Sequence, residues 1–365
     1  MSFENQVIND DCVTWLAKQK EPFADLIFAD PPFNIGYKYD VYDDRKQYRE
    51  YRQWTFKWMR ACAQVLKPHG SFWIAIGDEY AAEVRFIARR LGLTLRNWII
   101  WHYTFGQNTR MKFARSHAHL FYFTKSQENF TFNPEAVAVA SDRLKEYNDK
   151  RAAPLGKVPF DVWIDFPRVC GTFSEREGWH PCQMPEGLLS RIVRACTDIG
   201  DRVLDPFAGS GTTLVVAKKL RRTFTGIELS EQYVEGIEER IKKTVAVSSV
   251  GTTPRTWTPA ERELLASLYV ENAIPSEQLH KHMNLWVTFV QQFNLRIYNV
   301  VAGEREPDEI WSQLERMRKS GKLGRVRVHA SVATTGDLEA PLIPAKELER
   351  MRRVQPNDNT KKRSK

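Results

Sequence analysis

The chain has 365 residues, of which 42% are hydrophobic and 11 are tryptophan, which is enough for a large packed core and more than one domain. It contains no run of 18 apolar residues and no secretory signal at its N-terminus, so neither a membrane span nor export is predicted. Five scattered cysteines without a Cys-x-x-Cys pair argue for reduced thiols in a cytosolic protein and against a zinc cage. The net charge of +9 favours a polyanionic partner without identifying one.

The stretch at residues 24–34, Ala-Asp-Leu-Ile-Phe-Ala-Asp-Pro-Pro-Phe-Asn, has the character of a buried strand that ends at Asp30. Pro31 and Pro32 end it because neither can donate a hydrogen bond to a sheet and each fixes its own φ. A carboxylate, a stiff backbone and the ring of Phe33 are thereby held at a strand end, where open α/β sheets bind ligands. A plain proline-rich turn is the alternative interpretation.

Helical and strand patterns alternate over the next residues. Apolar side chains recur with helical spacing from Tyr48 to Leu66, and the segment 68–70 is expected to end that helix. A strand is predicted at 71–76, a helix at 80–91 and another strand at 97–103. This alternation indicates a parallel sheet flanked by helices.

A basic loop at 106–115 interrupts the alternation. Its three positive charges, with no acid among them, are Arg110, Lys112 and Arg115. Either a solvated loop or a DNA-binding arm that faces phosphates agrees with this composition.

The region after the loop is less regular. His117 and His119 precede a strand at 120–124, and because no third ligand stands nearby, no metal site is predicted. Residues 130–179 have weak periodicity and scattered prolines, which is typical of a loop-rich insertion. Regular patterns return afterwards as a helix at 186–196, a strand at 202–204, a helix at 212–220 and a strand at 223–227.

A glycine-rich turn lies between the last two predicted strands. It begins at Asp205 and reads Asp-Pro-Phe-Ala-Gly-Ser-Gly-Thr-Thr. Gly209 and Gly211 let the backbone bend sharply and approach a ligand at a helix start. Glu228 ends the next strand, where an acid in a dinucleotide fold holds ribose hydroxyls. No third glycine follows, so the full dinucleotide pattern is not met, but the combination predicts an adenosine-containing cofactor.

Three motifs together resemble the DNA amino-methyltransferases, which make N6-methyladenine or N4-methylcytosine. They are Asp-Pro-Pro-Phe at 30–33, His-Pro-Cys-Gln-Met-Pro at 180–185 and the turn at 205–213. The resemblance covers about residues 5–245, and the motif order is similar to that of the circularly permuted beta class. It implies an α/β fold with a seven-stranded Rossmann-like methyltransferase sheet, S-adenosylmethionine as cofactor, no metal, and double-stranded DNA as partner.

The resemblance also implies which residues form the cofactor pocket. Cys182 and Met184 replace the Thr and Lys usual in the family, so it implies nothing about the contacts of these two side chains. The implied cofactor-binding residues are Asp205, Phe207, Gly209, Gly211, Thr212, Glu228, His180 and Gln183.

The first motif is expected to be catalytic. An exocyclic base amine is a poor nucleophile because its lone pair is delocalised into the ring, and acceptors for its two hydrogens favour the reactive geometry. The Asp30 carboxylate would accept one hydrogen and the Pro31 carbonyl the other, while Pro32 stiffens the turn. Phe33 would stack on a base that has been flipped out of the duplex.

Adenine N6 is the expected target because Asp, rather than Ser, opens the motif, and Ser is the commoner start among cytosine-N4 enzymes. The alternatives are cytosine N4, a protein amide nitrogen, and a DNA-binding module without activity. Residues 181–183, Pro-Cys-Gln, also match the tripeptide that carries the nucleophile of cytosine-C5 methyltransferases, but no companion motif of that class surrounds them.

A separate helical part is predicted after a linker at 249–257. Thr258 is expected to cap a helix that runs to about residue 270, with Pro259 at the first helical position and Glu261 completing a capping box. Further helices near 276–282, 285–298 and 307–320 and a short strand at 324–328 are expected, and this part would serve either DNA binding or dimerisation.

The expected organisation is therefore a catalytic domain at 1–248, with a target-recognition insertion at about 106–178, and a helical accessory domain at 258–330. A basic tail at 331–365, expected to be partly disordered, would contact phosphates without sequence preference. We expect a cytoplasmic enzyme associated with nucleoid DNA. A homodimer and a partner restriction enzyme are both left open.

Overall fold

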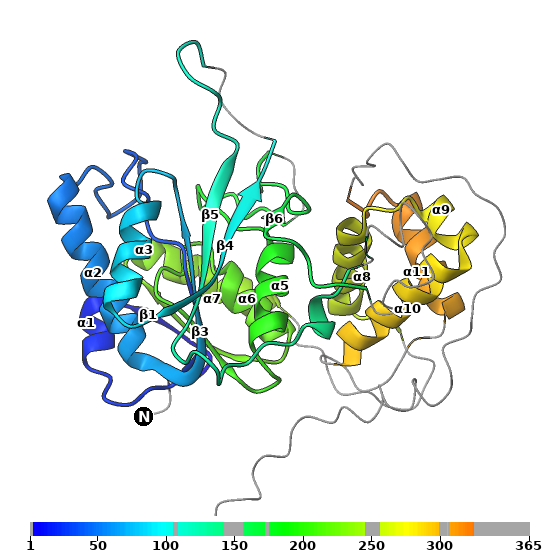
Figure 1. Cartoon of the computed structure of the whole chain (residues 1–365), viewed down its shortest axis with the longest axis horizontal. Helices are drawn as coiled ribbons and strands as arrows, with labels where there is room; N and C mark the ends of the chain where they lie inside the picture. The colour runs from blue at the N-terminus through cyan, green and yellow to red at the C-terminus, as the bar shows by residue number, and fades with distance from the viewer. Residues whose placement is uncertain are drawn as a thin grey trace, which may run out of the picture.

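The computed structural model describes residues 3–104, 109–139, 141, 156–171, 175–244, 256–298, 305 and 307–324. Its described strands form one eight-stranded sheet in the order β1-β8-β7-β2-β3-β5-β4-β6 (Figure 1). The strands are β1 (Gln6–Asn9), β2 (Ala24–Ala29), β3 (Leu66–Ile76), β4 (Thr94–His102), β5 (His117–Thr124), β6 (Val162–Trp163), β7 (Arg202–Asp205) and β8 (Thr223–Glu228).

The sheet confirms the predicted α/β class and differs from the prediction in two ways. It has eight described strands in place of seven, with the short strands β1 and β6 at its two edges. It is also not wholly parallel, since β5 runs antiparallel to both β3 and β4. The chain returns from β4 to β5 through a loop, and such a direct return joins antiparallel neighbours, whereas parallel neighbours need a crossover.

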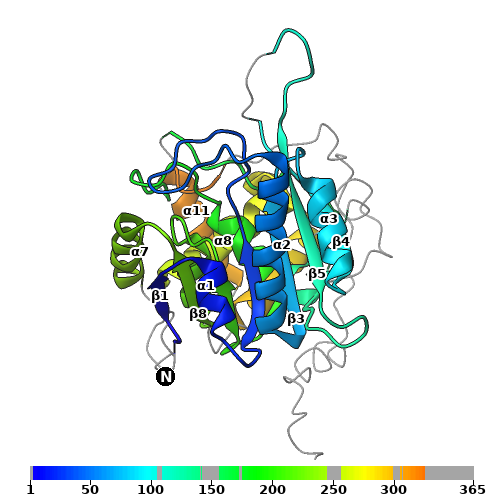
Figure 2. The ribbon, with the colours of Figure 1, turned by 90° about the vertical axis from the view of Figure 1, so that its left-hand side faces the viewer.

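Helices cover both faces of the sheet. Leu26 and Phe28 of β2 point to one face, and the alternate residues Ile27 and Ala29 point to the other. The first face packs against α5 (Glu186–Cys196) and α6 (Thr212–Lys219), with α7 (Glu231–Lys243) beside them. The second face, seen in Figure 2, packs against α1 (Cys12–Ala17), α2 (Tyr48–Val65) and α3 (Ala81–Arg90). β2 is buried along its whole length, and all of its residues except Asp25 are apolar.

The segment 68–70 was predicted to separate a helix from a strand. This is wrong, because the segment lies inside β3. Helix α2 ends at Val65 and β3 begins at once, with a register shift opposite β2 between Ala24 and Leu26. The bulge directs Lys67 Nζ (2.8 Å) and His69 Nε2 (2.9 Å) onto the carboxylate of Asp25, which is only 2% exposed. Pro68 and Gly70 therefore shape a strand bulge that brings positively charged partners to the buried carboxylate of Asp25.

The C-terminal helices are α8 (Pro259–Asn272), α9 (Ser276–Lys281), α10 (Met283–Tyr298) and α11 (Pro307–Lys319). The predicted capping box is confirmed, because the Thr258 and Glu261 side chains each bond to the other's backbone N–H. Of the described helices, none is long and apolar enough to span a bilayer. The tail at 331–365, the strand predicted at 324–328 except Gly324, and most of the 249–257 linker lie outside the described residues.

A buried ionic cluster joins α8 and α10 to α5. Glu271 of α8 accepts from Arg296 Nη2 (2.8 Å) and lies 3.1 Å from Arg191 Nη2 and 3.7 Å from Arg194 Nη2, and all four side chains are almost completely buried. Burial alone would raise the pKa of Glu271, but the three arginines outweigh it and hold the pKa below its ordinary value. Glu271 thus lies among three buried positive charges, of which Arg191 also binds Asp165 Oδ2 (2.8 Å).

We therefore expect Glu271→Ala to destabilise the protein by about 3–5 kcal/mol, because it removes the carboxylate that Arg194 and Arg296 face in a buried environment. Denaturant unfolding at pH 7 measures this change. Glu239→Ala is the matched control, since Glu239 pairs with Lys243 on the exposed face of α7 and should leave the unfolding free energy unchanged. Equal unfolding free energies for the two variants would contradict the role of the cluster.

Candidate active site

A cavity of about 710 Å3 opens where β2, β7 and β8 end. The three strands are parallel neighbours, so the residues that follow them meet at one edge of the sheet. Asp30 follows β2, Asp205 ends β7 and Glu228 ends β8, and all three line the cavity.

Nearly all residues predicted for the site line this one cavity. Gly211 does not: its φ is +74°, and a Cβ there would lie 2.7 Å from Ile237 Cγ2, so it lets α6 start close against α7. Arg110 is also absent from the lining. The predicted residues that do line the cavity are Asp30, Pro31, Pro32, Phe33, Lys112, Arg115, His180, Gln183, Asp205, Phe207, Gly209, Thr212 and Glu228.

The glycine turn is held by the two acids that end its flanking strands. Asp205 Oδ1 accepts from the Phe207 N–H (3.0 Å), and Glu228 Oε2 accepts from the Gly209 N–H (2.8 Å). Gly209 has φ +53°, and a Cβ there would lie 3.1 Å from His180 Nε2. A side chain at this position would therefore be strained and would crowd the pocket wall.

Arg240 of α7 supports the same turn from behind. Its Nη1 donates to the Ser210 carbonyl (2.9 Å) and to Thr212 Oγ1 (3.0 Å), and its Nη2 binds Glu186 (2.6 Å). Sequence reasoning missed this residue because it stands in the charged run Glu-Glu-Arg-Ile-Lys-Lys, which resembles a solvated helix face. In the fold it is only 7% exposed.

The chain that leaves the Asp-Pro-Pro-Phe motif is clamped. Tyr51 Oη donates to the Pro32 carbonyl (2.6 Å), and the buried carboxylate of Asp44 accepts from the Asn34 N–H (2.7 Å). Asn34 has φ +58°, and its amide nitrogen donates to the Lys46 carbonyl (2.9 Å). These contacts fix the motif without using the Asp30 side chain.

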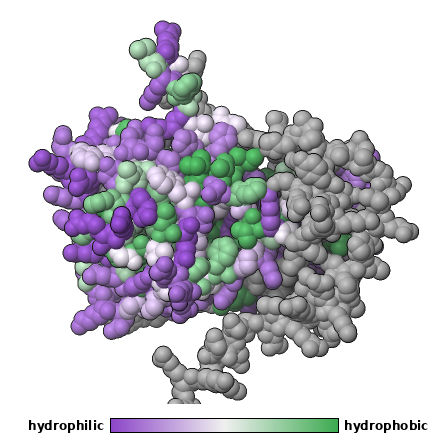
Figure 3. Space-filling view, in the orientation of Figure 1, coloured by the Kyte–Doolittle hydropathy of each residue, from purple (hydrophilic) through white to green (hydrophobic). Residues whose placement is uncertain are grey.

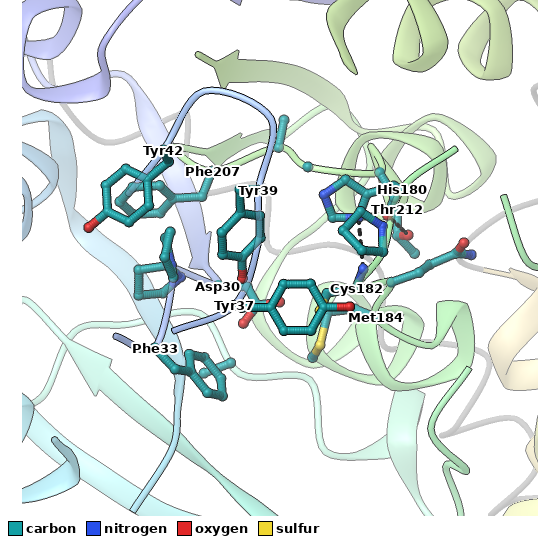
Figure 4. A pocket seen from close by; sticks show the side chains of 18 of the residues that line it. Asp30, Phe33, Tyr37, Tyr39, Tyr42, His180, Cys182, Met184, Phe207 and Thr212 are labelled. Atoms are coloured by element: carbon teal, nitrogen blue, oxygen red, sulfur yellow. Dashed lines mark hydrogen bonds between the residues drawn. The ribbon is translucent and has the colours of Figure 1, made fainter. Parts of the chain in front are cut away.

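A tyrosine-rich loop at 36–45 covers part of the cavity. Its aromatic side chains Tyr37, Tyr39 and Tyr42 line the wall, and Figure 4 shows the Tyr37 ring between Asp30 and Cys182. Ser230 Oγ donates to Asp40 Oδ2 (2.5 Å) and so connects this loop to the start of α7. The loop thereby bridges the two halves of the site.

The environment of the cavity favours the uncharged forms of its buried titratable side chains. Desolvation and the nearby Asp205 carboxylate raise the pKa of Asp30 to about 7, and Arg168 opposes this rise. Burial also raises the pKa of Asp205 to about 7 and lowers that of His180 to about 4, so His180 is neutral at physiological pH. Arg168 lines the cavity too, and no motif or periodicity marks it because it lies in the loop-rich region 130–179.

Two residues of the His-Pro-Cys-Gln-Met-Pro motif have contacts that limit their roles. Gln183 Oε1 accepts from the Glu177 N–H (2.8 Å) and its Nε2 donates to the Glu175 carbonyl (2.6 Å), so its amide holds the neighbouring loop. Burial and the Asp30 carboxylate raise the pKa of the Cys182 thiol. A nucleophilic cysteine needs the opposite shift.

The basic loop is only partly available to phosphates. Arg115 Nε binds Asp78 Oδ1 (2.9 Å) and its Nη2 binds Glu79 Oε1 (2.8 Å). His119 accepts through Nδ1 from Trp98 Nε1 (3.0 Å). Within the described ranges, no three His, Cys, Asp or Glu side chains gather as metal ligands.

A sheet that brings an Asp-Pro-Pro-Phe motif and a glycine turn to one cavity defines a nucleotide-cofactor enzyme of the methyltransferase class. Residues 24–239 match the family model described as DNA methylase, and this chain belongs to that family. It is therefore an S-adenosylmethionine-dependent DNA methyltransferase. The matched region ends within α7, before the C-terminal helices.

Two relatives agree with this assignment, and one solved structure shares the fold. Type II methyltransferase M.HpaI of Haemophilus parainfluenzae is 34% identical over 239 residues, which cover 65% of this chain and 74% of the relative. DNA adenine methyltransferase YhdJ of Escherichia coli (strain K12) is 37% identical over 237 residues, which cover 63% and 80%. The PvuII DNA methyltransferase (cytosine-N4-specific) shares the fold, with a TM-score of 0.51, 18% identity and coverage of 73% of this chain and 92% of that chain.

The residues of the cavity fit this cofactor. The close backbone approach at Gly209, the carboxylate of Glu228 and the ring of Phe207 are the groups that an adenosine moiety requires. Phe207 is fixed by the rings of Trp54 and Trp58, at centroid distances of 5.6 and 5.2 Å.

We expect Arg240→Gln to weaken S-adenosylmethionine binding by about tenfold or more, because the turn loses two charge-assisted hydrogen bonds. Isothermal titration calorimetry of the folded variant measures this. Lys242→Gln, two residues along α7 and largely exposed, is the control and should bind like the wild type. Unchanged affinity in a folded Arg240→Gln protein would show that the turn keeps its shape without this support.

Proposed function

We propose that this enzyme methylates N6 of adenine in double-stranded DNA, with the target base flipped out of the duplex and placed beside Asp30 and Phe33. The observation that carries the proposal is that the Asp30–Phe33 motif and the glycine turn line one cavity. Adenine is favoured over cytosine by the Asp at the start of the motif. One relative, YhdJ, is an adenine methyltransferase by name.

In this proposal Asp30 and Pro31 act on the amine. The carboxylate of Asp30 accepts one amine hydrogen and the Pro31 carbonyl the other, so that the nitrogen lone pair turns out of the ring plane toward the methyl donor. Bound S-adenosylmethionine supplies an electrophilic methyl group. Asp30 needs no strong basicity for this role, because the proton is lost only after the nitrogen has become positively charged. The Phe33 ring stacks on the extruded base and offsets part of its unstacking cost.

The second half of the site would hold the cofactor. The two carboxylate oxygens of Glu228 accept hydrogen bonds from the backbone N–H groups of Gly209 and Ser230. Each oxygen keeps a second lone pair that can accept a hydrogen bond from a ribose hydroxyl. Asp205 and Gly209 keep the turn open, and Thr212 and His180 complete the wall. Gln183 contributes by holding the loop at 175–177 in place.

Incubation of the enzyme with DNA and methyl-labelled S-adenosylmethionine, followed by nucleoside mass spectrometry, tests the target. We expect N6-methyladenine. N4-methylcytosine would keep the amine mechanism and change the base, whereas 5-methylcytosine, or no labelled nucleoside, would overturn the proposal. Sequencing of the methylated DNA from the same reaction gives the recognition site.

We expect Asp30→Ala to lower methyl transfer by about 10²–10³-fold or more while S-adenosylmethionine binding persists, because only an acceptor of the amine is lost. Single-turnover transfer and cofactor titration measure the two properties separately. Cys182→Ala is the comparison in the same cavity, and it should retain most activity because its thiol stays protonated. Normal turnover of Asp30→Ala would refute the mechanism, and an inactive but folded Cys182→Ala would revive a cysteine nucleophile.

The pH dependence follows from the pKa of Asp30, which is raised to about 7. Below this value Asp30 is protonated and accepts poorly, so kcat/KM should rise with pH through about 7. Arg168 lowers the pKa of Asp30, so Arg168→Gln should move this rise to higher pH, whereas Arg168→Lys should move it less. Profiles that coincide for wild type and Arg168→Gln would contradict the assignment to Asp30.

The cellular setting is also part of the proposal. The named relatives are bacterial methyltransferases, one of them of type II, which supports an enzyme that acts on nucleoid DNA in the cytoplasm. The circularly permuted motif order and the division into catalytic and helical domains stay predictions, and a homodimer stays open. Light scattering of the purified chain tests the last of these.

A further inference from the structure

The connection between β4 and β5 leaves two large apolar side chains almost completely exposed. Met111 is 96% exposed and Phe113 99%. They belong to residues 109–116, here called the arm, which projects beyond the body of the described molecule in Figures 1 and 2. Figure 3 shows hydrophilic and hydrophobic residues side by side on this projection. Single exposed apolar residues are ordinary, but two of them at the end of an arm indicate that a partner covers them.

Positive charges alternate with these side chains. Arg110 and Lys112 flank Met111, and in the described part of the chain neither forms an ion pair. Arg115, nearer the sheet, is instead held by Asp78 and Glu79, directly after β3. The arm therefore has a fixed base and a cationic, apolar end.

The arm stands beside the catalytic motif. Thr109, Lys112 and Arg115 line the same cavity as Asp30 and Phe33. The reason is the reversed direction of β5, because the turn between two antiparallel strands lies at the edge where β4 ends and β5 begins. A base that enters the cavity must leave its stack next to the arm.

We propose that Met111 and Phe113 enter the DNA stack at the place of the extruded base, while Arg110 and Lys112 contact the phosphates on either side. This inference rests on the proposed function, in which the target base is flipped out of double-stranded DNA. Duplex DNA offers the required pair of chemistries, an anionic backbone and flat apolar base faces that become accessible when a base leaves. Filling the gap stabilises the extruded state and lowers the cost of presenting the base to Asp30.

The test compares two duplexes that carry the recognition site, one fully paired and one with an abasic position opposite the target base. The second duplex already lacks the pairing that opposes extrusion. We expect Met111→Ala/Phe113→Ala to lower kcat/KM at least about tenfold on the paired duplex and to stay within about threefold of wild type on the abasic one. Arg110→Gln/Lys112→Gln should weaken transfer to both duplexes alike and reduce its salt dependence.

Phe86→Ala is the matched control, because Phe86 is 59% exposed on α3 and lines no part of the cavity. It should behave like wild type on both duplexes, and thermal unfolding of all variants should be unchanged. Equal losses for the Met111/Phe113 variant on the two duplexes, normal activity on the paired one, or loss of self-association as its sole defect would each overturn the inference. Wild-type enzyme that methylates no DNA would instead overturn the proposed function.

Discussion

The parallel pairing of β2 with β7 is the constraint on which the site depends. It places the ends of two strands that lie far apart in sequence next to each other, and each ends in a buried or half-buried aspartate, Asp30 or Asp205. Neither carboxyl group is easily charged, because burial raises both pKa values to about 7 and the charge of Asp205 acts on Asp30. The cavity thus combines an acceptor for an amine with a turn for a nucleotide at a distance that sheet geometry sets.

Much of this arrangement was visible in the sequence, because it depends on patterns that are local. The apolar run of β2, the amphipathic helices and the glycine turn each carry their own signal, and Thr258 and Glu261 mark the start of α8 correctly. The edge strands β1 and β6 are too short for periodicity, and the direction of β5 depends on a connection rather than on composition. Arg168 and Arg240 could not be found, since only the fold shows which charges of a loop or a helix face inward.

The C-terminal helices are connected to the glycine turn at 205–213 by ion pairs as well as by apolar packing. Glu263 of α8 binds Lys219 Nζ (2.7 Å), Lys219 binds Glu186, and Glu186 binds Arg240, whose guanidinium supports the turn. Together with the cluster around Glu271, these ion pairs run through the same apolar core that covers one face of the sheet. Residues beyond the matched family region therefore belong physically to the environment of the glycine turn.

The reversal of β5 has a consequence for how such an enzyme diversifies. The arm belongs to the connection between β4 and β5, which already pair with each other. The length of the arm can therefore change without changing how the core packs. The entropy of closing a loop grows only logarithmically, and each doubling of its length costs about 0.6 kcal/mol. Insertions and deletions in the arm therefore change the folding free energy little, and the catalytic edge of the sheet keeps its position.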